Sequence, residues 1–174
     1  MAHCIHLIGW CVIVAATKKG EGKRSMSETT SATNEAQRVA AWMVERDRLV
    51  QSLGITLDNI GDGFATARMR VNETMLNSFA MGHGGALFAV ADAAFSYACN
   101  AGNRKSVAVH CTIDYLAATE EGDRLTAIAQ LTARTGRNAI FDVPVTNEQG
   151  VTVVLFRGVA RQIGGSVLPE CGEK

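Results

Sequence analysis

The chain has 174 residues, a length that fits one domain with a substantial core and argues against two. Its 17 Lys and Arg balance its 17 Asp and Glu, so no basic surface indicates nucleic acid as the main partner. The five Cys and four His form neither a Cys-x-x-Cys pair nor a zinc-type spacing. We therefore expect reduced thiols, no metal site and a cytoplasmic location.

The first 33 residues differ in composition from the rest, and we expect them to be a disordered or non-native extension. The apolar run 7–16 is too short to span a bilayer, and basic residues follow it instead of preceding it as in a signal peptide. A cleaved export signal is the alternative interpretation. A Ser/Thr-rich lead of the kind that precedes a capped helix begins at Met26. The domain would then span 34–169, followed by a tail of five residues, 170–174.

The first half of this domain alternates between helical and extended patterns. An amphipathic pattern over 34–52, closed by Gly54, predicts a helix. Apolar and polar residues alternate over 55–59 and 63–71 around a Gly-Asp-Gly turn, which predicts a hairpin. The stretch 83–101 predicts a long central helix, and its mostly small residues on one face indicate that another element packs very close.

Four strand-like stretches follow, separated by turns rich in Gly, Asn and Asp: 107–116, 124–135, 138–146 and 151–163. The order of helix, two strands, long helix and four strands predicts an α+β fold with an antiparallel sheet wrapped around the central helix. Such a sheet leaves strand edges exposed. Pairing of edges between subunits would cover them, so we expect at least a homodimer.

The start of the central helix carries the clearest chemical signal. Gly84 and Gly85 open it, and the unpaired N–H groups and dipole of a helix start favour a polarised oxygen. Asp92 is a single carboxylate among Ala, Val and Phe, so its desolvation needs either compensation or a functional reason. The helix start can activate a carbonyl and the carboxylate can act as a base, and this combination indicates hydrolysis.

An HGG sequence at a helix start, with Asp nine residues after the His, resembles the hotdog-fold acyl-CoA thioesterases. The chain looks most similar to their phenylacetate-degradation branch, from about residue 48 to residue 169. The matching segments are Met75-Leu-Asn77, His83-Gly-Gly85, Leu87-Phe88, Ala91-Asp92, Ala94-Phe95, Tyr97-Ala-Cys-Asn100, Cys111-Thr-Ile-Asp114 and Leu155-Phe-Arg-Gly158.

The resemblance implies a catalytic role for four residues. Gly84 would polarise the thioester carbonyl through its N–H, and Asp92 would act as the nucleophile or activate a water. Asn77 would orient the nucleophile or the carbonyl, and His83 would mainly support the loop. Some relatives position the water with a Ser or Thr on the next strand, where this chain has Ala108.

The same resemblance implies the residues that bind substrate. The stretch 115–120 and the turn at Gly136 would approach the coenzyme A arm, whose phosphates suit arginine. An aromatic acyl group would lie against a ring one turn before the carboxylate. Core packing of that ring and a solvated hairpin tip are the structural alternatives. The predicted binding residues are Gly85, Phe88, Leu116, Ala117, Arg134, Arg137 and Asn138.

The spacing of the two reactive groups indicates a site shared between subunits. Gly84 and Asp92 are eight positions apart, roughly 12 Å along a helix, which is too far for both to touch one carbonyl. Two antiparallel helices related by a two-fold axis would bring Gly84 of one subunit to Asp92 of the other.

We therefore expect a hydrolase for aromatic, phenylacetyl-type acyl-CoA, working as a homodimer or homotetramer without metal, redox cofactor, nucleic acid or membrane. Coenzyme A enters only as part of the substrate. Two alternatives use the same scaffold. A hotdog enoyl-CoA hydratase would need a His close to a carboxylate, and a non-catalytic acyl-CoA-binding protein would lack Asp92 or carry a DNA-binding segment.

Overall fold

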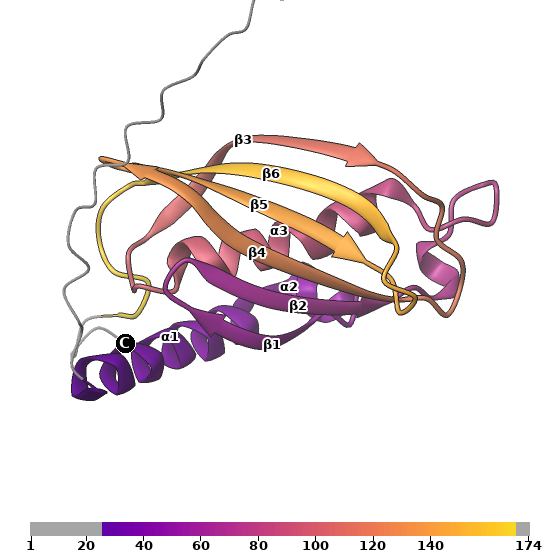
Figure 1. The fold of residues 1–174 in the computed structure, drawn as a ribbon. Coiled ribbons are helices and arrows are strands. Elements are labelled where there is room, and N and C mark those ends of the chain that lie inside the picture. The colour runs from indigo at the N-terminus through magenta and orange to yellow at the C-terminus, as the bar shows by residue number, and fades with distance from the viewer. Residues whose placement is uncertain (1–25, 170–174) are drawn as a thin grey trace, which may run out of the picture.

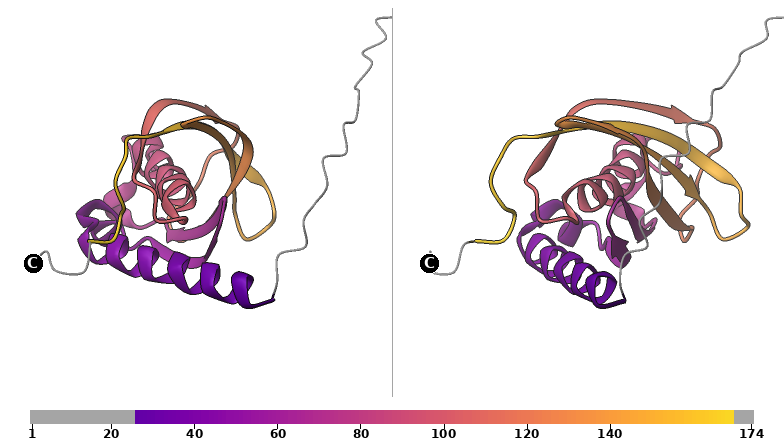
Figure 2. Two further views of the ribbon diagram at one scale, coloured as in Figure 1. Left: turned by 90° about the vertical axis from the view of Figure 1, so that its left-hand side faces the viewer. Right: turned by 60° about the vertical axis from the view of Figure 1, so that its left-hand side comes forward.

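The computed structural model describes residues 26–169, in which a six-stranded antiparallel sheet curls around one long helix, α3 (Figure 1). A second long helix, α1, packs against β1, the strand at one edge of the sheet (Figure 2). The elements are α1 Met26–Arg46, α2 Arg48–Ser52, β1 Thr56–Gly61, β2 Phe64–Arg70, η1 Glu73–Met75, α3 Gly84–Asn100, β3 Ser106–Tyr115, β4 Arg124–Thr135, β5 Asn138–Thr146 and β6 Thr152–Gln162. The predicted α+β architecture is confirmed.

The strand order is β1-β2-β4-β5-β6-β3, with every neighbouring pair antiparallel. Three of the five pairings are between consecutive strands. β3 instead follows α3 directly in the chain and lies beside the last strand, β6. This order leaves β1 and β3 as the two edges, and β3 exposes Val107 and Val109 to solvent.

The predicted first helix is two helices in the structure. The backbone becomes extended at Asp47 (φ −83°, ψ 95°), and its side chain accepts a hydrogen bond of 3.1 Å from Val50 N–H. Asp is among the most favourable helix N-caps, so it ends one helix and begins the next. α1 also begins at Met26, eight residues before the predicted start, so that boundary was wrong. Residues 1–25 and 170–174 lie outside the described part of the chain.

The predicted strand bounds agree with the structure to within two residues, and those of β4 and β5 coincide with it. The short helix η1 was not predicted. Asn72 begins it by accepting a hydrogen bond of 3.0 Å from Thr74 N–H. None of the helices in residues 26–169 is long and apolar enough to cross a membrane.

The concave face of the sheet packs very close to α3, as the small residues of that helix predicted. The α3 residues Ala91, Ala94 and Ala98 are buried. Gly158 in β6 meets the Phe95 ring so closely that a Cβ atom on it would lie 2.7 Å from Phe95 Cε2. The small residues at these positions let the sheet wrap the helix.

We expect Gly158→Ala to destabilise the fold by about 1–3 kcal/mol, the usual cost of overpacking a dense core. The added methyl group must displace the fully buried Phe95 ring. Chemical denaturation measures the free energy of unfolding. The double variant with Phe95→Leu is expected to recover part of the loss, and a single variant as stable as the wild type would contradict the close packing.

Candidate active site

The start of α3 is held by the side chain of the residue before it. His83 is the N-cap of α3, and its Nδ1 accepts a hydrogen bond of 2.9 Å from Gly85 N–H. Its own N–H donates to the Met75 carbonyl at 2.7 Å, which ties the helix start to the preceding loop. These bonds give His83 a supporting position, and its part in catalysis stays a prediction.

Gly84, the first residue of α3, has an N–H group that donates no hydrogen bond to any other residue of the described part of the chain. Gly84 lines a hollow of about 410 Å³. Four of the predicted site residues therefore share one hollow: Asn77, Gly84, Leu116 and Ala117. The others that line it are Met81, Gly82, Leu87, Tyr115, Ala118 and Thr119.

Asn77 builds the loop that forms one wall of this hollow. Its side-chain oxygen accepts hydrogen bonds from Phe79 N–H (2.8 Å) and Met81 N–H (3.2 Å). The loop is tight enough to hold Ala80 at a positive φ of 58°. The Asn77 NH₂ group has no hydrogen-bond acceptor within residues 26–169, so it is the part of this side chain left to meet a substrate.

Asp92 is half-buried, and within the described part of the chain its carboxylate has neither a hydrogen bond nor an ion pair. The structural alternatives, a loop cap or a buried Arg partner, therefore find no support. Burial raises the pKa of Asp92, and the nearby Asp47 carboxylate raises it further. Asp92 also affects two thiols. Burial, and after it the Asp92 carboxylate, raises the pKa of Cys99 to about 12. The same two causes raise the pKa of Cys111 above its ordinary value. The carboxylate thus lies near α2 and near the concave side of β3.

The raised pKa predicts the pH dependence of a reaction that needs ionised Asp92. Activity should rise with pH through this raised pKa, and Asp47→Asn should move the acid limb of the kcat/KM profile to lower pH by removing the second carboxylate. Asn caps a helix as well as Asp does, so α2 is retained. Asp114→Asn, on the outer face of the sheet, is the control. An acid limb that Asp47→Asn leaves in place would contradict the coupling.

The predicted coenzyme A arginines lie far from this hollow within one chain. Arg134, Arg137 and Asn138 line a small hollow of about 50 Å³ beside Cys99, near the last turn of α3. α3 has 17 residues, so the two hollows are separated by roughly the 25 Å length of the helix. Arg104 lines the same hollow, although no sequence motif indicates it and its charge is its only signal in the sequence.

Two further predicted residues lie outside both hollows. Phe88 is partly buried and packs edge-on against Phe156, with ring centroids 5.4 Å apart at an angle of 73°. Gly85 is exposed at the helix start, and its N–H is engaged by His83. The structure therefore supports a packing role for Phe88 within one chain, and its contact with an acyl group stays a prediction.

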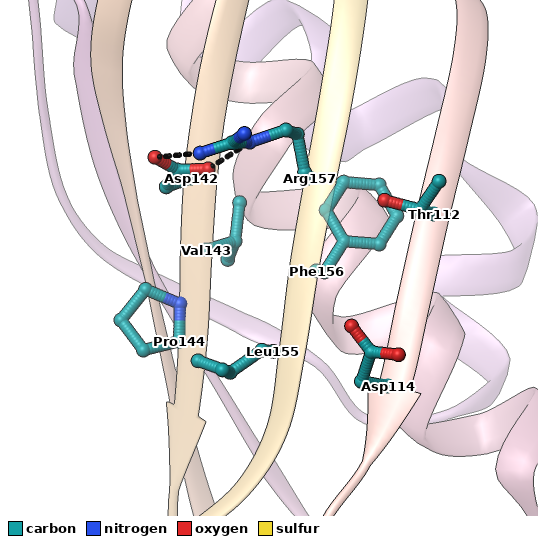
Figure 3. Close-up of a pocket in the computed structure, with 8 residues that line it drawn as sticks. All are labelled: Thr112, Asp114, Asp142, Val143, Pro144, Leu155, Phe156 and Arg157. Carbon is teal, nitrogen blue, oxygen red and sulfur yellow. Dashed lines mark hydrogen bonds and ion pairs between the residues drawn. The ribbon is translucent and has the colours of Figure 1, made fainter. Parts of the chain in front are cut away.

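Another hollow, of about 450 Å³, lies on the convex face of the sheet, on the side away from α3 (Figure 3). None of the predicted site residues lines it. Its most polar feature is the bidentate ion pair between Arg157 and Asp142, at 2.6 and 2.9 Å. The Arg157 guanidinium holds the pKa of Asp142 below its usual value, so this carboxylate is neither free nor basic.

Comparison with known proteins identifies the family. The sequence profile of the Thioesterase superfamily matches residues 81–154, from the loop before α3 into β6. The acyl-coenzyme A thioesterase PaaI of Escherichia coli (strain K12) is 41% identical over 138 residues, which cover 79% of this chain and 99% of the relative. This chain belongs to the hotdog-fold thioesterase superfamily.

Solved structures agree with this thioesterase fold. The E. coli PaaI protein from the phenylacetic acid degradation operon superposes with a TM-score of 0.76 at 41% identity, covering 78% of this chain and 98% of that one. A variant of PaaI from Thermus thermophilus gives 0.65 at 32% identity, covering 67% and 100%. The predicted family is confirmed, and this family assignment makes the chain a thioester hydrolase.

Proposed function

We propose that this thioesterase hydrolyses aromatic acyl-CoA thioesters of the phenylacetyl type to a free acid and coenzyme A. The observation that carries the proposal is the pair of reactive groups on α3, the Gly84 N–H and the half-buried Asp92 carboxylate, neither of which has a hydrogen-bond partner within residues 26–169. The name of the E. coli relative supports coenzyme A thioesters as substrates. The phenylacetic acid degradation operon of the E. coli protein supports an aromatic acyl group.

The complete site requires two chains, and we propose a homodimer, alone or paired into a homotetramer. If two antiparallel α3 helices cross at Phe88, Gly84 of one chain lies level with Asp92 of the other, because each is four positions from the crossing point. The same symmetry places the last turn of α3, with its arginine hollow, beyond the helix start of the other subunit, because Asn100 is 12 positions from the crossing point and Gly84 only four. The end of one helix then lies roughly 12 Å past the start of the other along the axis. The exposed apolar edge of β3 supports pairing on this side of the molecule.

Coenzyme A would then lie across the two subunits. The thioester carbonyl accepts a hydrogen bond from Gly84 N–H, and the phosphates reach Arg134 and Arg137 of the second subunit. Leu116 and Ala117 form the wall along the pantetheine arm. This arrangement accounts for the separation of the predicted binding residues within one chain.

The chemistry follows from these positions. Gly84 N–H and the dipole of α3 stabilise the negative charge that develops on the carbonyl oxygen. Asp92 of the second subunit either attacks the carbonyl carbon directly or removes a proton from a water that attacks it. When water attacks, breaking of the C–S bond leaves the free acid, and the coenzyme A sulfur takes the proton that Asp92 removed. When Asp92 attacks directly, breaking of the C–S bond leaves a mixed anhydride with Asp92 and a coenzyme A thiolate. A water then hydrolyses this anhydride, which releases the free acid, restores the carboxylate and supplies the proton that the thiolate takes up. The Asn77 NH₂ group orients the nucleophile or the carbonyl, and Phe88 lines the acyl site.

A panel of acyl-CoA thioesters with detection of the released thiol tests the function. We expect phenylacetyl-CoA and its ring-hydroxylated forms to be hydrolysed with a higher kcat/KM than straight-chain thioesters. Arg137→Ala should raise the KM for the CoA thioester about tenfold, the size of one lost charge-assisted hydrogen bond, and leave the pantetheine thioester unaffected because it lacks the nucleotide phosphates. Absence of thiol release from every thioester would overturn the proposal.

A further inference from the structure

Tyr115, the last residue of β3, reaches across to the start of α3. Its hydroxyl donates a hydrogen bond of 2.9 Å to the Gly84 carbonyl, 31 positions away in the chain. The ring lies so close that a Cβ atom on Gly84 would be 3.1 Å from both Cζ and the hydroxyl oxygen. Tyr115 is half-exposed and lines the same hollow as Gly84. The tyrosine and the glycine therefore occupy one compact contact at the mouth of the site.

This contact fixes one particular peptide group from both ends. The carbonyl of the Gly84–Gly85 peptide accepts from Tyr115, and the N–H of the same peptide donates to His83 Nδ1 at 2.9 Å. The N–H of Gly84 itself belongs to the preceding peptide and has no acceptor in the described part of the chain. Two hydrogen bonds thus hold the backbone immediately beside the Gly84 N–H group.

Two consecutive glycines at a helix start need such support. Glycine has the greatest backbone freedom of all residues, and helix ends fray. An oxyanion donor works only if it is held at 2.7–3.1 Å from the developing charge, so residual motion of this turn costs rate. Because Gly84 has no side chain, the Tyr115 ring can approach, and its hydrogen bond restricts the backbone motion of the glycine pair.

We propose that Tyr115 is a positioning residue: it anchors the first turn of α3 through the Gly84 carbonyl and thereby aims the Gly84 N–H at the thioester. The inference rests on the proposed function. It assigns no contact with the reacting atoms to Tyr115, so its effect should appear in kcat and in the order of the helix start, and not in the binding of coenzyme A.

The test compares Tyr115→Phe with Tyr97→Phe. Tyr97 is the only other tyrosine of the chain, and its buried hydroxyl has no hydrogen-bond partner among the residues that the structure describes. For phenylacetyl-CoA, Tyr115→Phe should lower kcat about fivefold, the size of one neutral hydrogen bond, at unchanged KM. Amide hydrogen exchange followed by NMR on the ligand-free protein should show faster exchange of Gly85 N–H. The control should change neither quantity.

The outcomes separate the two proposals. Unchanged Gly85 exchange and unchanged kcat in Tyr115→Phe would overturn the positioning role while the wild type still hydrolyses its substrate. A raised KM at unchanged kcat would also overturn the positioning role, because Tyr115 would then contribute only to substrate binding. Faster Gly85 exchange in a protein that hydrolyses no CoA thioester would overturn the proposed function, and with it the catalytic consequence of the anchor.

Discussion

Asp92→Asn is expected to lower kcat for phenylacetyl-CoA by about 10²–10⁴-fold, the usual contribution of a general base. Asn keeps the size and the hydrogen-bonding shape of Asp, but it cannot ionise, so neither direct attack nor proton removal from water is possible. The carboxylate has no partner in the described part of the chain, so its loss breaks no ion pair or cap there. Steady-state kinetics with thiol detection measure the effect.

The same variant should be more resistant to heat than the wild type at neutral pH. Burial raises the pKa of Asp92 above its ordinary value of 3.8, so the folded protein holds this proton more tightly than the unfolded chain does. The wild type therefore loses stability as pH rises through the raised pKa, whereas the variant does not titrate there. Scanning calorimetry should show a Tm advantage that is absent below pH 3.8 and grows as pH rises.

Asp114→Asn, an exposed substitution on the convex face, provides the control for both measurements. It should leave kcat and Tm unchanged. Wild-type turnover in Asp92→Asn would remove Asp92 from the mechanism. A variant less stable than the wild type at every pH would show instead that the carboxylate is structural.

Gly84→Pro is expected to lower kcat about 10²–10³-fold, the loss measured when one oxyanion donor is removed. Proline lacks the N–H group and is accommodated at the first position of a helix. The preceding residue, His83, already has the extended backbone that proline requires, with ψ at 131°. Gly84→Ala is the matched variant: it keeps the N–H but adds a Cβ 3.1 Å from the Tyr115 ring, so its loss should be smaller.

Combining a Gly84→Pro chain with an Asp92→Asn chain in one dimer tests whether the subunits share the site. A heterodimer of one Gly84→Pro chain and one Asp92→Asn chain should contain one intact site and recover about half of the wild-type activity, because each two-fold pair builds two equivalent sites. Differently tagged chains allow the heterodimer to be isolated before the assay. A verified heterodimer as inactive as its parents would contradict a site in which Gly84 and Asp92 belong to different chains.

The spacing of apolar residues along the chain was sufficient to predict most helices and strands, because this spacing depends only on neighbouring residues. Strand β4 carries buried Leu125, Ala127 and Ala129 at alternate positions, and a period of two is legible without any knowledge of the partner strand. The break at Asp47 escaped the same reasoning, since the apolar spacing continues across it. The Asp47 side chain accepts a hydrogen bond from Val50 N–H, and such a local bond competes with a continuous helix.

The sequence by itself determined the order of the elements and the chemical groups on α3, a glycine pair and a carboxylate eight positions beyond Gly84. Only the tertiary structure decided what surrounds them. Because β3 lies beside β6, its last residue, Tyr115, contacts Gly84 across 31 positions of the chain. At the opposite end of the helix, Arg104 and Arg137 line the same hollow. Such meetings follow from strand order and the curl of the sheet, which no local spacing of residues encodes.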